Sequence, residues 1–353
     1  MEKVHSLQDD EILLQQETGH IAASFFLEFS QKSPKFDANS PQQTKRLSAF
    51  LNSPEKGIFL IVMRGDVQLA KAALFIGSKN TNDAYLGCCE VREGPEAERL
   101  MFVLLTTAVG IAKARGAKIV YGPLDKSTWY NYRIRTDGHE LSFPWEPGPQ
   151  PFLADCWRRF GFQTAVRFES LAYSKSSLIN MRMVSWLFVP ALLRARRQGY
   201  QVVPFHADWK QNLEQVYRIA QDSFDGSFLY EPISFSDFVD LYAPMGQSLD
   251  FRPSFFLVNP AGEAVGFVLA FYDREYLVIK SLGLVSSLQG KGLGRCLAHA
   301  TLKAGADDGY TAGIAALVRR GNRTALMAEL VKKLRVLSWI HDYELLAYQI
   351  PDR

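Results

Sequence analysis

The segment Gln289-Gly290-Lys291-Gly292-Leu293-Gly294 lies between an apolar run and a helical pattern. The preceding run, 276–285, has the apolar character of a buried strand, and residues 295–304 have the composition of a helix. Glycines let a backbone approach an anion closely, and the unpaired N–H groups of a helix's first turn point toward it. The order strand, glycine loop, helix therefore predicts a phosphate-binding site.

The glycine spacing excludes two common phosphate loops. A Walker loop requires Ser or Thr after its lysine, but Lys291 is followed by Gly292. A dinucleotide-binding fingerprint requires G-x-G-x-x-G, whereas the glycines here are spaced G-x-G-x-G. The pattern Q-x-x-G-x-G does fit, and it resembles the pyrophosphate loop of the GNAT acyltransferase superfamily, whose members bind acetyl-CoA or another acyl-CoA.

The sequence after the loop extends this resemblance. A second apolar run, 313–318, follows at the distance that the family has, and then comes Asn322-Arg323-Thr324-Ala325. In the family an N-x-x-A at this point begins the next helix, here expected over 323–334, with its Asn near the CoA arm. The alternative is a glycine-rich turn that only packs a helix on a sheet.

The resemblance implies an acyl-CoA site in which loop amides hold the pyrophosphate and strand backbone pairs with the pantetheine. The expected cofactor-binding residues are Leu284, Val285, Gln289, Gly290, Lys291, Gly292, Leu293, Gly294, Arg295 and Asn322.

The catalytic group departs from the family pattern. Counting from Asn322, the usual thiolate-protonating Tyr is replaced by Glu329, which could act as acid or base if burial raised its pKa. The alternative is a solvated helical glutamate. Four other polar residues stand near strand ends, and the sequence does not rank them: Tyr276, Lys280, Asp342 and Tyr343. We expect Cys296 and His299 to be packing residues.

Composition limits the class of partner. The net charge of +3 over 353 residues, without a long basic run, argues against nucleic acid. Four cysteines without a C-x-x-C pair predict a reduced, cytoplasmic protein without a metal site. The apolar run 183–193 is too short to span a bilayer. A helix on a membrane surface is conceivable because arginines follow this run, but we expect a buried interdomain helix and no membrane partner.

Strand and helix patterns occur twice in the same order, which predicts an α/β (α+β) fold. We expect two tandem GNAT-like domains, each a mixed, mostly antiparallel sheet flanked by helices. The expected limits are 1–175 and 199–353, joined by an interdomain segment at 176–198. In the first domain we expect a helix at 42–51, and a closing strand at 166–173. Residues 343–350 are expected to close the sheet of the second domain.

The first copy is predicted to be degenerate. Its counterpart of the glycine loop contains Pro95, which lacks an N–H, and glutamates that would repel a pyrophosphate: Glu93, Glu96 and Glu98. A long aromatic loop at 121–152 follows. This loop either contributes to an acceptor pocket or fills the empty cleft of the degenerate copy.

The resemblance therefore predicts an N-acyltransferase that moves an acetyl or other acyl group from CoA to an amine by direct attack. The expected acceptor is a small-molecule or peptide amine, and the expected state is a monomer or homodimer. The alternative is a non-catalytic acyl-CoA sensor or scaffold, since the usual Tyr is missing.

Overall fold

The computed structural model of the protein describes residues 2–7, 10–15, 57–78, 80–137, 142–173, 181–321 and 337–351, the first two ranges by backbone alone. The expected helices at 42–51 and 323–334 lie outside these ranges. The chain forms two compact units. Unit 1 contains Met1–Asp137, Pro147–Arg167 and Tyr343–Arg353, and unit 2 contains Gly138–Glu146 and Phe168–Asp342.

Unit 1 has a sheet with strand order β1-β2-β3-β4-β5-β6-β14. Its strands are antiparallel except for the parallel pair β5 and β6. The elements are β1 (Glu2–Leu7), β2 (Asp10–Gln15), β3 (Ile58–Arg64), β4 (Val67–Ile76), β5 (Asp83–Val91), α3 (Ala97–Ala114), β6 (Ile119–Gly122), β7 (Ile134–Arg135), α4 (Pro151–Phe160), the first part of β8 (Gln163–Tyr173) and the second part of β14 (Leu337–Gln349).

Unit 2 repeats this plan with the strand order β8-β13-β12-β11-β10-β9. Among the strands described there, β12 and β13 alone form a parallel pair. The elements are α5 (Met181–Trp186), α6 (Val189–Arg197), β9 (Gln201–Pro204), η1 (Trp209–Asn212), α7 (Leu213–Phe224), α8 (Phe235–Tyr242), η2 (Ala243–Gln247), β10 (Phe255–Val258), β11 (Ala264–Asp273), β12 (Tyr276–Leu284), η3 (Ser286–Leu288), α9 (Gly294–Asp307) and β13 (Ala312–Arg319).

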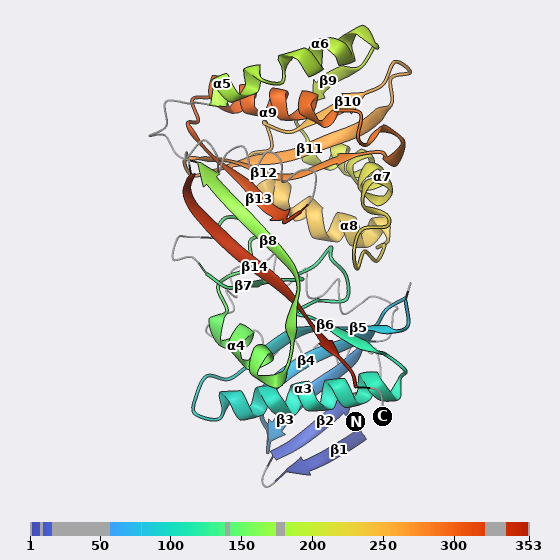
Figure 1. Ribbon diagram of the computed structural model, residues 1–353, viewed down its shortest axis with the longest axis vertical. Coiled ribbons are helices and arrows are strands. Elements are labelled where there is room, and N and C mark those ends of the chain that lie inside the picture. The colour runs from blue at the N-terminus through green and yellow to red at the C-terminus, as the bar shows by residue number, and fades with distance from the viewer. Residues whose placement is uncertain are drawn as a thin grey trace. The chain divides into compact units, whose positions relative to one another are not determined.

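The two halves of the chain share an order of elements. β3-β4-β5-α3-β6 in the first half corresponds to β10-β11-β12-α9-β13 in the second, with an antiparallel hairpin, a third strand, a helix and a parallel strand. In unit 2, α5, α6 and α9 cover one face of the sheet and α7 and α8 the other (Figure 1). The predicted fold class of tandem mixed sheets flanked by helices is confirmed.

The closing strands differ from the prediction. The second part of β14 pairs with β6 in unit 1, from Leu346↔Gly122 to Gln349↔Ile119. The second part of β8 pairs with β13 in unit 2, from Gly313↔Tyr173 to Arg319↔Phe168. Each sheet is thus completed by the last strand of the other half. The sequence predicted a strand in both segments, but it does not encode which strand each one pairs with. The domain limits at 175 and 199 stay a prediction.

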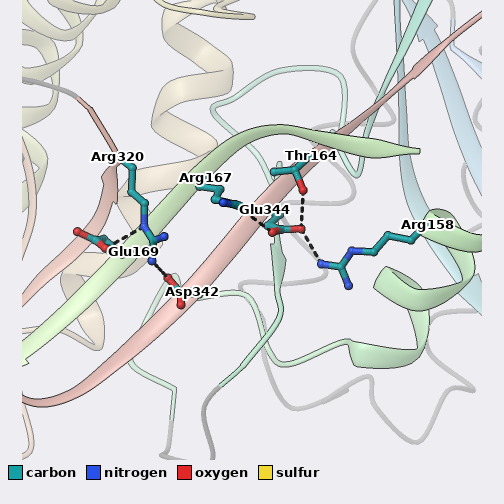
Figure 2. A network of polar contacts seen from close by, with 7 residues as sticks. All are labelled: Arg158, Thr164, Arg167, Glu169, Arg320, Asp342 and Glu344. Atoms are coloured by element: carbon teal, nitrogen blue, oxygen red, sulfur yellow. Dashed lines mark hydrogen bonds and ion pairs between the residues drawn. The ribbon is translucent and has the colours of Figure 1, made fainter. Parts of the chain in front are cut away.

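Ion pairs hold the exchanged strands within each unit (Figure 2). In unit 1, Glu344 accepts hydrogen bonds from Arg158 at 2.6 Å and from Thr164 at 3.0 Å. Burial raises the pKa of Glu344, but these bonds and the charges of Arg158 and Arg167 lower it more, so the pKa lies below its ordinary value.

In unit 2, Arg320 at the end of β13 pairs with two carboxylates. It donates to Glu169 of β8 at 3.0 Å and also to Asp342 of β14 (Figure 2). The Glu169 side chain is buried, so this charge needs a partner in the fold. Asp342, one of the unranked polar candidates, is therefore used in an ion pair.

Candidate functional site

Strands β12 and β13 separate halfway along their length. Their parallel pairing runs from Tyr276↔Ala312 to Ile279↔Ala315. Beyond Ile279, β12 continues to Leu284 and is paired with β11 alone among the described strands. The last residues of β12 therefore have one edge at which another extended chain could add hydrogen bonds.

A bulge lies in each strand where the two separate. In β12, Lys280 is the extra residue, because Ile279 pairs with Ala270 and Ser281 with Leu269. In β13, two residues oppose Ser170 of β8, and one of them, Leu317, has a φ of +56°. Bulges bend a strand and change the direction of its side chains. This pair of bulges accounts for the separation.

The glycine loop connects the separated end of β12 to α9. Gly290 and Gly292 have φ angles of +77° and +79°, which are left-handed values that favour glycine. A Cβ added at Gly292 would meet no atom within 4 Å, so the backbone is open there. At Gly294 a Cβ would come within 3.1 Å of Leu282 Cδ2.

Five consecutive amides of this loop point to no carbonyl in the described part of the chain. Gln289 N–H donates to Ser286 O at 3.2 Å, and Arg295 N–H donates to Gly292 O at 3.2 Å. Between them, the N–H groups of residues 290–294 have no backbone acceptor among the described residues. They stand at the N-terminus of α9, where the helix dipole adds positive potential.

The charges around the loop favour an anion. Lys291 and Arg295 are exposed, and the first turn of α9 contains no acidic residue. Cations at a helix N-terminus are unfavourable unless an anion is nearby, so this turn suits a diphosphate group. The nearby carboxylate of Asp222 accepts Ser286 N–H at 2.6 Å and Ser286 Oγ at 3.1 Å, before the loop begins.

The Gln289 side chain fixes the start of the loop. Its Nε2 donates to Ser223 O of α7 at 3.2 Å and to Leu284 O of β12 at 3.1 Å. Val285 N–H donates to Val265 O at 3.0 Å, within the pairing of β12 with β11. The structure thus brings together the predicted residues 284–295. Asn322 and Glu329 lie outside the described residues.

An aromatic cluster lies beside Lys280. Trp145, from the long aromatic loop, has ring-centroid distances of 5.9 Å to Tyr242, 6.2 Å to Phe251 and 5.4 Å to Phe271. Lys280 Nζ lies 5.5 Å from the Trp145 ring centroid. Trp145 has a φ of +71°, and its buried indole N–H has no acceptor in the described chain. Such strain and an unpaired donor are frequent at ligand sites.

The residue after Trp145 forms a fully buried pair with a histidine. Glu146 Oε1 lies 2.6 Å from His341 Nδ1, and both side chains are inaccessible to solvent. Glu146 Oε2 also accepts Phe143 N–H at 3.2 Å, which fixes the turn that carries Trp145. On the other side, Trp339 stacks on His341 at 4.1 Å. The sequence singled out the aromatic loop as a whole but gave no signal for a role of Glu146 or of His341.

The other candidates have distinct surroundings. Tyr276 OH accepts a hydrogen bond from Trp339 Nε1 at 3.4 Å, so it belongs to the same cluster as His341. Tyr343 is buried in unit 1. Cys296 is buried in the core, and His299 Nδ1 lies 2.8 Å from Ser185 O, as expected of packing residues.

Unit 1 contains the counterpart of the separated strands, but its own chain occupies the edge. The β5–β6 pairing ends at Tyr85↔Tyr121, and a bulge follows at Cys88. There Leu124 N–H donates to Leu86 O at 2.9 Å, and Cys88 N–H donates to Asp125 Oδ1 at 2.7 Å. Burial raises the pKa of Asp125 to about 6. Residues 124–125 thus fill the position that is open in unit 2.

The helix start in unit 1 also differs. Glu96 precedes α3 and pairs with Arg64 at 3.0 Å and with Arg99 at 3.2 Å. Glu98, in the first turn, pairs with Arg159 at 2.9 Å. These carboxylates stand at the start of α3 and would repel an anion there. The loss of acyl-CoA binding in the first copy stays a prediction.

Neither a membrane-spanning helix nor a cluster of metal-ligating side chains occurs in the described ranges. No helix there is long and apolar enough to cross a membrane. Within the same ranges, no group of three or more His, Cys, Asp or Glu residues could hold a metal ion.

Comparison with known proteins gives one family. The model of the acetyltransferase (GNAT) family matches residues 213–328. No curated protein sequence matches the chain.

Three solved structures are similar over nearly the whole chain. A tandem GNAT protein from the clavulanic acid biosynthesis pathway has a TM-score of 0.50 and 11% identity, over 98% of this chain and 99% of that one. A GCN5-related N-acetyltransferase from Kribbella flavida has a TM-score of 0.52 and 11% identity, over 97% and 71%. A conserved protein of unknown function from Enterococcus faecalis V583 has a TM-score of 0.58 and 8% identity, over 96% and 73%. At these identities the likeness shows the fold alone.

Proposed function

We propose that the protein is an N-acyltransferase that uses acetyl-CoA or another acyl-CoA, because the model of the acetyltransferase (GNAT) family matches residues 213–328. The observation that carries the proposal is the row of amides at 290–294 that have no backbone acceptor among the described residues, beside the open edge of β12. Amides and helix dipole bind the diphosphate, with Lys291 and Arg295 adding charge. The edge of β12 near Leu284 pairs with the pantetheine.

In the proposed reaction, the amine nitrogen attacks the thioester carbonyl carbon. A C–N bond forms, the C–S bond breaks, the sulfur leaves as a thiolate, and the nitrogen loses one proton. Positioning provides much of the rate in such a transfer. We expect the thioester to lie where β12 and β13 separate, next to Lys280, because the loop and the β12 edge would hold the rest of the cofactor. Glu329 is proposed as the acid or base, following its place in the sequence.

We place the acceptor on the Trp145 side of β12. Lys280 and Trp145 meet where the strands separate, and the Glu146–His341 pair fixes the loop that carries Trp145. A buried indole N–H without an acceptor is costly in the free protein, so an oxygen atom of the acceptor would relieve this cost. Of the two roles considered for the aromatic loop, residues 142–146 favour the acceptor pocket.

The test measures CoA binding and acetyl transfer separately. Isothermal titration calorimetry with CoA reports on the site, and release of free CoA thiol from acetyl-CoA with a panel of small amines and peptides reports on turnover. Binding with turnover supports the proposal. Binding without turnover on any amine supports the sensor or scaffold, and no binding of CoA refutes both.

A further inference from the structure

An apolar stripe is exposed along α5 and α6 in unit 2. Met183, Trp186, Leu187 and Leu193 are 54%, 71%, 61% and 48% exposed. Met183 and Trp186 lie on α5, Leu187 follows it in the turn, and exposed Pro190 and Leu193 lie three residues apart on α6. These five residues are called the α5–α6 stripe. The expectation that residues 183–193 are buried is therefore wrong for these residues, although Ser185 and Phe188 in the same run are buried.

The opposite side of the two helices explains why the stripe faces outward. Met181 and Phe188 pack with Leu277 and Leu302, and Ala195 packs with Leu293 and Leu297. The short helices bury this inner side against α9 and the sheet. Because each has only one covered side, the remaining apolar residues stay in solvent, and such patches mark interaction sites.

Positive charge borders the stripe. Arg194, Arg196 and Arg197 are exposed at the end of α6 and form no ion pair with any described residue. Arg182 on α5 is paired with Asp307 at 2.6 Å, and Lys303 also contacts Asp307. The Asp307 carboxylate is thus paired with two cations. The border of the stripe is cationic.

We propose that the α5–α6 stripe docks the protein on an anionic lipid membrane surface. Helices that lie in the lipid interface typically combine apolar side chains such as Trp and Leu with neighbouring arginines, and the α5–α6 stripe has this composition. The arginines complement anionic headgroups, and each adds to the attraction. A protein partner or a second copy would require no such excess of unpaired arginines. The sequence predicts no membrane partner, and the exposed stripe argues for a peripheral one.

Vesicle sedimentation with the full chain tests the proposal. Vesicles of phosphatidylcholine with 30% phosphatidylglycerol should retain the protein, and phosphatidylcholine alone should retain at least ten times less. The pair Trp186→Ser and Leu187→Ser should weaken retention at least ten-fold. Neutralising Arg194, Arg196 and Arg197 with Gln should remove the preference for anionic vesicles.

A matched control separates the stripe from general hydrophobicity. Phe235 on α8 is 42% exposed, and Phe235→Ser should leave vesicle retention unchanged. All variants should keep the melting temperature and CoA affinity of the parent. Equal retention by parent and Trp186→Ser/Leu187→Ser protein would overturn the proposal. The proposal would also be overturned if the parent protein formed a dimer and did not bind anionic vesicles, and if this pair of substitutions dissociated the dimer.

Discussion

Two glycines at opposite ends of α9 allow a direct test of the diphosphate site. Gly292 precedes the helix with a φ of +79°, and Gly309 follows it with a φ of +86°. A Cβ at either position meets nothing within 4 Å. Changing each residue to Ala therefore forces the same left-handed strain without a clash. The expected loss of stability is similar for both, about 1–2 kcal/mol.

The two substitutions should differ in their effect on CoA. Gly292→Ala tilts the amides that face the diphosphate and places a methyl group in the open space. Losing one hydrogen bond to a charged group costs about 1.5–3 kcal/mol, which raises the Kd for CoA by roughly 10- to 150-fold. Gly309→Ala leaves the loop intact, so its Kd should match that of the parent.

Calorimetry with CoA and with pantetheine completes the assay. Pantetheine lacks the diphosphate, so Gly292→Ala should affect its binding far less than that of CoA. Thermal melts of both variants check that the strain is alike. Equal Kd values for CoA in Gly292→Ala and Gly309→Ala protein would refute the reasoning, because strain alone would then explain any effect.

Three further outcomes follow from the structure. Calorimetry should give one CoA per chain, because residues 124–125 fill the equivalent edge in unit 1; a stoichiometry of two would contradict this. Trp145→Phe removes an indole N–H that has no acceptor among the described residues, and it should raise the KM for the acceptor about ten-fold. The KM for acetyl-CoA should stay unchanged. As a control, Trp157→Phe, at a buried position in unit 1, should alter neither KM. Glu344→Gln should lower the free energy of unfolding at pH 7 by about 1 kcal/mol. Since the pKa of Glu344 is lowered by folding, its contribution is present above about pH 4.3 and is lost as the pH falls through the lower folded value. Chemical denaturation should therefore show a smaller difference at pH 3.5, and an equal difference at both pH values would count against the ion pairs.

Local patterns predicted the elements that position the cofactor site. β12, the glycine loop, α9 and β13 lie where apolar runs and glycine spacing indicated, because these patterns depend on neighbours in the sequence. The separation of β12 from β13 was not predicted. It depends on bulges at Lys280 and Leu317, which are set by pairing with other strands.

Long-range contacts limited the prediction of the acceptor side. The Glu146–His341 pair joins residues far apart in the chain, and neither residue belongs to a motif. Likewise, the run 183–193 is apolar enough for a buried helix, but burial depends on whether a second layer covers it. The exposed side chain of Trp186 shows that the sequence identifies the apolar residues but not whether another element packs against them.

The exchange of closing strands has a consequence for how the chain can be divided. A fragment that ends at residue 175 lacks β14, and a fragment that starts at residue 199 lacks β8. Each would expose an unpaired strand edge, at β6 or β13, and such edges promote aggregation. During synthesis, the sheet of unit 1 remains incomplete until residues 346–349 of β14 have left the ribosome, whereas the sheet of unit 2 has all its strands once β13 has emerged.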